Sequence, residues 1–265
     1  MQTIERYETA GSVLAAPERN NYFYGMLMDV YHFKRETAYF NRMRRMINRM
    51  VLGYGVVCGL DVQPGPKENQ VIVTPGMALD QLGNEIIISH PVGPLTIPED
   101  VIQKATGQDL VERYRQKPVD PDLSGCVQVL LCYQECLVDP VPALAGDCAS
   151  ADGCLPGTVR EQFKIKFVPG CSDHPDHDCR LQGVIGKRHI THDVIAQWVT
   201  YNCPTTPNDP CIPLANVIVD QDQGHHCEPD MIDITVRPVV YNLDLIYEIL
   251  LGLAEDRPQN YGRSK

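Results

Sequence analysis

The sequence lacks three features that would each point to a particular class of protein. No stretch approaches the roughly 18 apolar residues of a membrane-spanning helix. The first residues lack the basic segment and the apolar core of a secretory signal. Basic charge is also scarce, because 34 acidic side chains face 23 basic ones, and such a surface repels phosphate backbones. We therefore expect cytoplasmic synthesis, no membrane insertion and no nucleic-acid partner.

The common catalytic motifs are missing as well. The sequence contains no P-loop, no dinucleotide-binding Gly-x-Gly-x-x-Gly, no Gly-x-Ser-x-Gly nucleophile elbow and no His-Glu-x-x-His. Asp80 and Glu85 flank a predicted turn, where carboxylates that cap the turn are much commoner than a catalytic pair. The sequence thus predicts a protein without enzymatic activity.

A long amphipathic helix is predicted between Met26 and Val51. Apolar side chains recur there at steps of three and four residues, which places them on one face of a helix: Met26, Val30, Phe33, Phe40, Met43, Ile47 and Met50. Asp29 is expected to cap the first turn and Gly53 to end the helix. The arginines at 42–49 are predicted to form a solvated flank that opposes the helix dipole.

The apolar surface of this helix is wider than one seam, and this width predicts a subunit interface. The predicted interface residues are Phe33, Tyr39, Phe40, Met43, Met46 and Met50. Heptad-like spacing lets one face pack on the chain's own strands while another meets a neighbouring subunit. The alternative is a helix buried on both sides within one subunit.

Short strand-like segments follow the helix and predict an α+β fold. They lie at 55–62, 71–76, 80–88, 126–138, 163–167, 214–219 and 231–236. Because most connections are too short for a helical crossover, we expect mostly antiparallel, sandwich-like pairing. A C-terminal helix, capped by Asn242, is expected to pack on the long helix. The predicted division is an arm at 1–21, a helix-plus-β domain at 22–117 and a Cys-rich β domain at 118–265.

The helix and the strands after it carry a motif of glycine, proline and polar positions: Tyr24, Gly25, Asn48, Arg49, Gly53, Gly55, Gly59, Pro75, Gly76, Asp80 and Gly83. This motif resembles the module at the base of phage tail fibres and of baseplate-associated proteins, including bacterial proteins of phage-tail-like contractile injection systems. The resemblance implies a structural docking role, often in trimers, without chemistry. It also implies baseplate, sheath or fibre proteins as partners and an assembled particle as the working location.

Cysteine is abundant, with eleven residues of which ten lie between Cys126 and Cys227. The densest group of metal-ligand side chains is Cys171, His174, His177 and Cys179, and Cys-x-x-His is a spacing that a tight loop wraps around zinc. The His177-x-Cys179 pair is close for tetrahedral geometry, so ligands from 203–227 are alternatives. Isolated disulfides such as Cys148–Cys154, or plain free thiols, remain equally open, and Cys58 is predicted to be a small buried side chain.

Three functions follow from these patterns. The motif favours a structural adaptor in a phage-tail-like particle, with no cofactor. The cysteine density favours a zinc- or disulfide-stapled binding module. A metal-dependent hydrolase would need His174, His177 and a distant third ligand.

Overall fold

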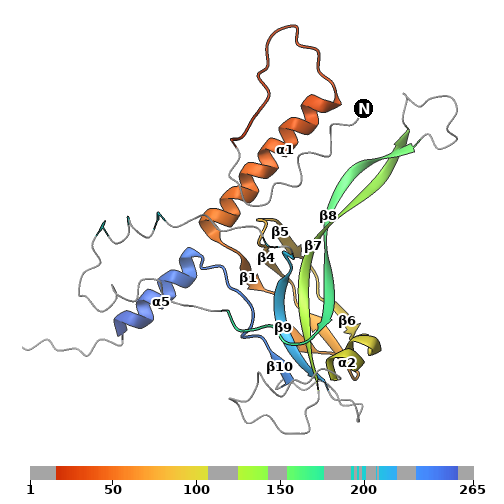
Figure 1. Cartoon of the computed structure of the whole chain (residues 1–265), viewed down its shortest axis with the longest axis vertical. Coiled ribbons are helices and arrows are strands. Elements are labelled where there is room, and N and C mark those ends of the chain that lie inside the picture. Colours follow the sequence, from red (N-terminus) through yellow and green to blue (C-terminus); the bar gives the residue numbers. More distant parts are fainter. Residues whose placement is uncertain are drawn as a thin grey trace, which may run out of the picture.

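The computed structural model describes residues 16–106, 125–142, 154–175, 209–219 and 231–255, with a few single positions between 192 and 207. The α+β prediction is confirmed, because helices lie outside mostly antiparallel sheets (Figure 1). The predicted boundary between the two domains and most of the helix expected at 189–198 lie outside the described residues.

The predicted long helix is present as α1 (Val30–Ile47), followed by a π-helical turn η2 (Asn48–Leu52). Asp29 caps it as expected, since its Oδ1 accepts a hydrogen bond from the His32 backbone N–H at 3.2 Å. Gly53 ends it with a φ of 84°, a left-handed conformation that glycine adopts without steric cost.

Six short strands follow η2 and form two three-stranded sheets with the orders β1-β4-β5 and β2-β3-β6. Their bounds are β1 (Gly55–Gly59), β2 (Val62–Pro64), β3 (Gln70–Val73), β4 (Gly76–Leu79), β5 (Glu85–Ile88) and β6 (Val92–Thr96). Each of three passes of the chain runs through both sheets, because β1 continues into β2, β3 into β4 and β5 into β6 after a short bend. The inward side chains of both sheets join one hydrophobic core.

A third sheet has the order β10-β9-β7-β8. Its strands are β7 (Gly125–Pro142), β8 (Cys154–Pro169), β9 (Ile212–Val219) and β10 (Ile232–Asp233). The helix α2 (Glu99–Thr106) buries Ile102 and Ala105 in the same core as the inward residues of β7 and β9. The buried side chains of all three sheets therefore form one continuous cluster.

The strand predicted to end before Asp139 is longer than expected. β7 pairs with β9 only as far as Leu131, but it pairs with β8 out to Pro142. Beyond Leu131 the two strands project from the body as a two-stranded ribbon, which we call the hairpin arm (Figure 1). The first half of β7 is buried, and most of the arm is exposed.

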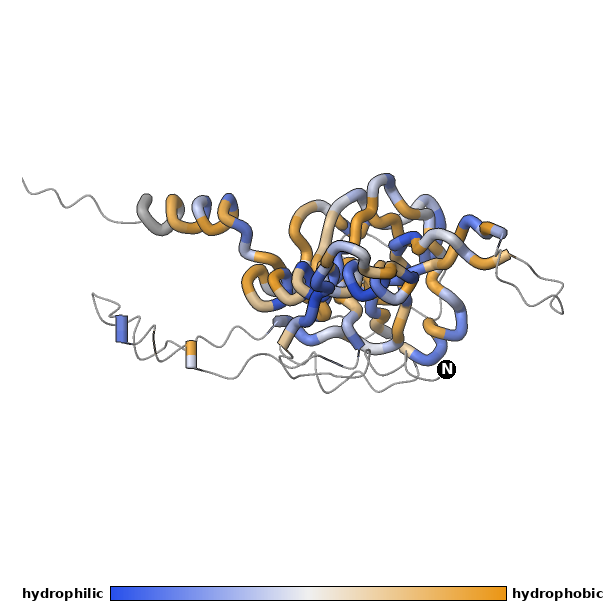
Figure 2. The backbone as a smooth tube through the Cα atoms, turned by 90° about the horizontal axis from the view of Figure 1, so that it is seen from above, coloured by the Kyte–Doolittle hydropathy of each residue, from blue (hydrophilic) through white to orange (hydrophobic). Residues whose placement is uncertain are grey.

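The C-terminal helix α5 (Leu243–Glu255) begins where expected, because Asn242 Oδ1 accepts from the Leu245 backbone N–H at 2.8 Å. Its predicted packing on α1 is wrong. α5 extends away from the sheets, separate from α1 (Figures 1 and 2). Its large apolar side chains are exposed, so the chain itself does not bury them.

Candidate functional site

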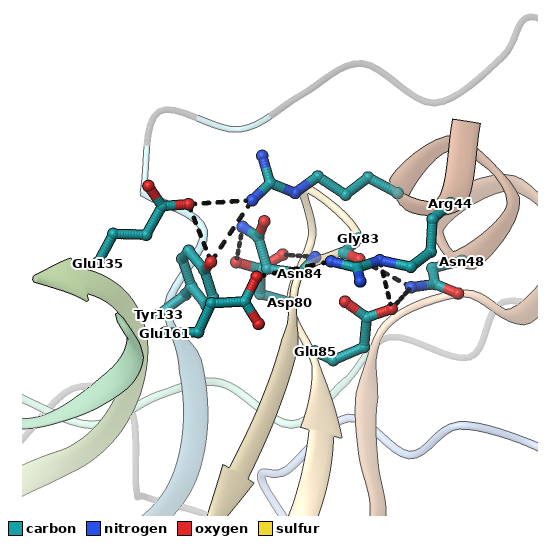
Figure 3. Close-up of polar contacts among 10 residues, drawn as sticks. Arg44, Asn48, Asp80, Gly83, Asn84, Glu85, Tyr133, Glu135 and Glu161 are labelled. Carbon is teal, nitrogen blue, oxygen red and sulfur yellow. Dashed lines mark hydrogen bonds and ion pairs between the residues drawn. The ribbon is translucent and has the colours of Figure 1, made fainter. Parts of the chain in front are cut away.

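The C-terminal end of α1 is fastened to the β4–β5 turn through a buried asparagine. Asn48 Nδ2 donates to the Gly83 carbonyl oxygen at 2.9 Å and to Glu85 Oε1 at 2.8 Å (Figure 3). Asn48 is only 8% exposed, so an apolar or charged replacement would leave these acceptors without a partner. We call this junction the helix root.

Two arginines tie the helix root to strands on both sides. Arg44 Nε lies 3.1 Å from Glu85 Oε1, and its Nη2 lies 3.6 Å from Glu161 Oε1 on β8. Arg45 Nη2 lies 3.2 Å from Glu135 Oε1 on β7. The prediction of a solvated arginine flank is therefore wrong for these two side chains, because they pair with carboxylates of the sheets.

Tyr133 completes the contact with β7. Its hydroxyl donates to Glu135 Oε1 at 2.9 Å, and the Arg45 guanidinium carbon lies 5.7 Å from the centre of its ring. Burial, followed by the hydrogen bond to Glu135, raises the pKa of the Tyr133 hydroxyl, so it remains a neutral donor. Sequence reasoning did not find Tyr133 or Glu135 as partners of the helix; the arginine excess of the helix was the available signal.

Asp80 holds the β4–β5 turn, as predicted for a turn-capping carboxylate. Its Oδ1 accepts from the backbone N–H groups of Leu82 at 2.9 Å and Asn84 at 2.8 Å, and its Oδ2 accepts from Asn84 Nδ2 at 2.7 Å. The residue is fully buried. Desolvation raises the pKa of the Asp80 carboxyl, while the hydrogen bonds from Asn84 and Leu82 oppose that rise.

The same turn contains the closest backbone contact of the root. A Cβ atom built on Gly83 would lie 2.1 Å from the Arg45 carbonyl oxygen, and Gly83 has a φ of 87°. Only glycine lets the turn approach the helix backbone in this way. Asn48, Asp80 and Gly83, which carry the resemblance to the tail-associated module, thus meet at one place in the structure.

The remaining motif positions are spread around this root. Gly53 ends η2, Arg49 lies within η2, and Gly55, Gly59, Pro75 and Gly76 lie in or beside β1 and β4. Tyr24 and Gly25 lie apart from them, in the turn that precedes α1, where Tyr24 is fully exposed.

Above the root, one side of α1 has no cover within the described part of the chain. The side chains that share this side are spaced by three and four residues, and we call them the exposed stripe: Val30, Phe33, Thr37, Phe40, Arg44, Ile47 and Val51. Phe33 is 61% exposed and Phe40 is 60% exposed. No residue of α1 is buried, so the alternative of a helix buried on both sides within one subunit is wrong.

The predicted interface residues divide between two sides of the helix. Phe33 and Phe40 belong to the exposed stripe. Tyr39, Met43, Met46 and Met50 are half-buried on the other side. The segment before α1 also contacts the helix, since Glu18 pairs with Arg35 at 2.6 Å and Asn20 Nδ2 donates to the His32 carbonyl oxygen at 2.7 Å. The described end of the predicted N-terminal arm therefore packs on its own helix.

The zinc prediction needs a correction at Cys171. Cys171 forms a disulfide with Cys126, and a disulfide sulfur is not the thiolate that zinc requires. His174 contacts the Thr235 hydroxyl at 3.1 Å, and its Nε2 lies 3.9 Å from Asp233 Oδ2. His177 and Cys179 lie outside the described residues, where no group of three metal ligands was sought; within the described part none occurs.

The other cysteines also differ from expectation. Cys132 forms a second disulfide with Cys211, just before β9. Cys154 is free and exposed, so it is not in the suggested bond with Cys148, which lies outside the described residues. Cys58 is exposed on β1 rather than buried. None of the described helices is both long enough and apolar enough to span a bilayer.

Comparisons with known proteins give only distant likenesses. No protein-family model and no curated protein matches the sequence. The crystal structure of TssK aligns with 91% of this chain and 48% of its own length, at 12% identity and a TM-score of 0.41, so the chain spans about half of TssK. A chain of the baseplate complex from the type VI secretion system aligns over 94% of this chain and 72% of its own length, at 12% identity and a TM-score of 0.32. Scores this low assign neither a shared fold nor a shared function.

Proposed function

We propose that the chain is a structural, non-catalytic subunit of a phage-tail-like contractile injection particle, acting as an adaptor in the baseplate or at the attachment of a fibre. The observation that carries the proposal is the anchored helix with an uncovered apolar side. The helix root holds α1 through a buried asparagine and two arginines, and the exposed stripe then stands clear of the sheets. Such a helix is built to be covered by another subunit.

Two further observations support this proposal. The motif that resembles tail-associated modules supplies the root itself, through Asn48, Asp80 and Gly83. The two disulfides suit a protein that works outside a reducing compartment, as an assembled particle does after leaving the cell. Association of copies through the side of α1, possible as a trimer, is part of the same proposal.

Copurification with sheath, tube or baseplate subunits tests the proposal. The tagged wild-type chain should bring down particle subunits from cells that make the particle. Phe40→Glu should lose them while keeping its melting temperature, because Phe40 is exposed and its replacement removes apolar contact area without disturbing the core. Ile87→Glu, at an equally exposed apolar position on β5, is the matched control and should still bring down the subunits.

A wild-type chain that copurifies with no particle subunit contradicts the proposal. Retention of the subunits by Phe40→Glu would show that α1 is not the docking element. Met46→Glu is informative in a different way, because Met46 is half-buried. This variant should lower the melting temperature as well as weaken docking.

A disulfide-stapled binding module is the second candidate, favoured by the bonds Cys126–Cys171 and Cys132–Cys211. It predicts binding of a soluble ligand that reduction abolishes while copurification fails. A zinc ion held by His177, Cys179 and ligands other than Cys171 stays a prediction, and metal analysis of the purified chain decides it.

A further inference from the structure

The described chain leaves two helices with apolar surfaces uncovered, α1 and α5. In α5, Leu243, Ile246, Tyr247 and Leu250 are all exposed, and so are Ile249 and Leu251. Apolar residues occupy most of the circumference of this helix, and a helix that is apolar on nearly all sides is normally buried. α5 therefore needs a partner surface, just as the exposed stripe of α1 does.

The two helices carry opposite charge. α1 holds five basic side chains, Lys34, Arg35, Arg42, Arg44 and Arg45, against the single acid Glu36. α5 holds three acids, Asp244, Glu248 and Glu255, and no basic residue. In an ideal helix these three acids lie within one narrow face, because their spacings of four and seven residues approach whole turns.

Their lengths also match. The thirteen residues of α5 extend about 20 Å, and the stripe from Val30 to Ile47 extends about 26 Å at 1.5 Å per residue. Leu243, Ile246 and Leu250 repeat the steps of three and four residues that the exposed stripe also shows.

We propose that α5 of one copy of the chain packs on the exposed stripe of α1 in a second copy. This inference rests on the association of copies included in the proposed function. The start of α5 is held on its own body, since Val240, which is 4% exposed, donates its backbone N–H to the Val56 carbonyl oxygen at 3.0 Å. From this fixed point α5 runs outward and away from its own α1 (Figures 1 and 2).

Pairing of α1 with α1 is the competing arrangement, and Arg44 opposes it. Arg44 occupies a position of the exposed stripe, so a parallel pair in register would bring two guanidinium groups together at the seam. The acidic helix α5 meets the same position without that repulsion.

Photo-crosslinking between distinguishable copies tests the proposal. Benzoylphenylalanine replaces Phe40 in an unlabelled full-length chain, which is mixed with a ¹⁵N-labelled wild-type chain and irradiated. Peptides from α5 of the labelled copy should be joined to position 40. The same probe at Ile87, an equally exposed position on β5, is the control and should give none of these products.

A charge test gives an independent readout. Asp244→Lys combined with Glu248→Lys should weaken association about tenfold in sedimentation velocity, and raising the salt concentration should weaken association of the wild type. Lys67→Glu, at an exposed site in the β2–β3 turn, should leave association unchanged. Helix content measured by circular dichroism confirms that α5 still forms.

Three outcomes overturn the inference: labelled products on α1 instead of α5, products only within one copy, or a wild-type chain that stays monomeric at high concentration. A monomer that still copurifies with particle subunits would reject this inference and leave the proposed function standing. Crosslinked copies that bind no particle subunit would do the reverse.

Discussion

At the scale of single residues, the buried carboxyl of Asp80 makes stability depend on pH. Burial raises its pKa above the value of 3.8 that an unperturbed aspartate has, so the folded chain binds the proton more tightly than the unfolded chain does. The contribution of Asp80 to the free energy of unfolding is therefore largest at low pH, and it falls as the pH rises through the folded pKa.

Asp80→Asn should remove this dependence. The difference in unfolding free energy between wild type and variant should shift in favour of the variant as the pH rises from about 3.5 to 7, and urea unfolding measures it. Glu68→Gln, which removes one exposed negative charge from the β2–β3 turn, is the control. A constant difference between wild type and Asp80→Asn over this range would contradict the raised pKa.

Gly83 and Gly25 allow the close approach at the helix root to be measured by itself. Both have nearly the same φ, 87° and 84°, but an added Cβ would meet the Arg45 carbonyl oxygen at Gly83 and nothing within 4 Å at Gly25. Gly83→Ala should therefore destabilise the chain by about 2 kcal/mol more than Gly25→Ala, because only the first forces the turn away from the helix. Equal losses for the two variants in urea unfolding would show that conformation alone explains the glycine.

The sequence predicted local features at this scale but not their partners. Asp29 and Asn242 were identified as caps because capping depends on residues three positions apart. Arg44 and Arg45 were placed in solvent because their partners, Glu161 and Glu135, lie about 90 or more positions away in the sequence. Ion pairs of this kind depend on the fold and leave no local pattern.

At the scale of elements, two disulfides fasten β7 to its neighbours. Cys126 bonds Cys171, just beyond β8, and Cys132 bonds Cys211, just before β9. Each bond closes a long loop in the unfolded chain and should stabilise the fold by about 2–4 kcal/mol.

Reduction should therefore lower the melting temperature by about 10 °C or more. The double variants Cys126→Ala with Cys171→Ala, and Cys132→Ala with Cys211→Ala, should each reproduce part of that loss. Cys58→Ala removes a free, exposed thiol and is the matched control. If thiol labelling proves complete reduction and the melting temperature stays unchanged, the disulfides do not stabilise the fold.

The elements differed from expectation where periodicity is silent about surroundings. The strand at 126–138 was predicted as buried, and its first half is, but β7 continues for four more residues as part of the exposed arm. The period of two in Leu137, Asp139 and Val141 is the same whether that face meets a core or solvent. For α5 the apolar content was correct and the predicted partner was wrong, because a helix pattern does not state which surface covers it.

At the scale of the whole molecule, the class and the strand directions were predictable from short connections and alternating side chains. The cysteine pairing was not, because eleven cysteines permit many pairings and sequence distance does not rank them. The protein as described is a single core with three projections: α1, α5 and the hairpin arm. Each projection exposes apolar side chains, among them Leu137 and Val159 on the arm.

The position of the disulfides also determines how the chain carries mechanical force. Tension applied along the backbone would pass from Cys126 along β7 to Cys132 and then across a sulfur–sulfur bond to Cys211. The 79 residues between Cys132 and Cys211, about 280 Å of extended chain, would carry no load. The hairpin arm would thus keep its shape under a pull that unravels the strands around it.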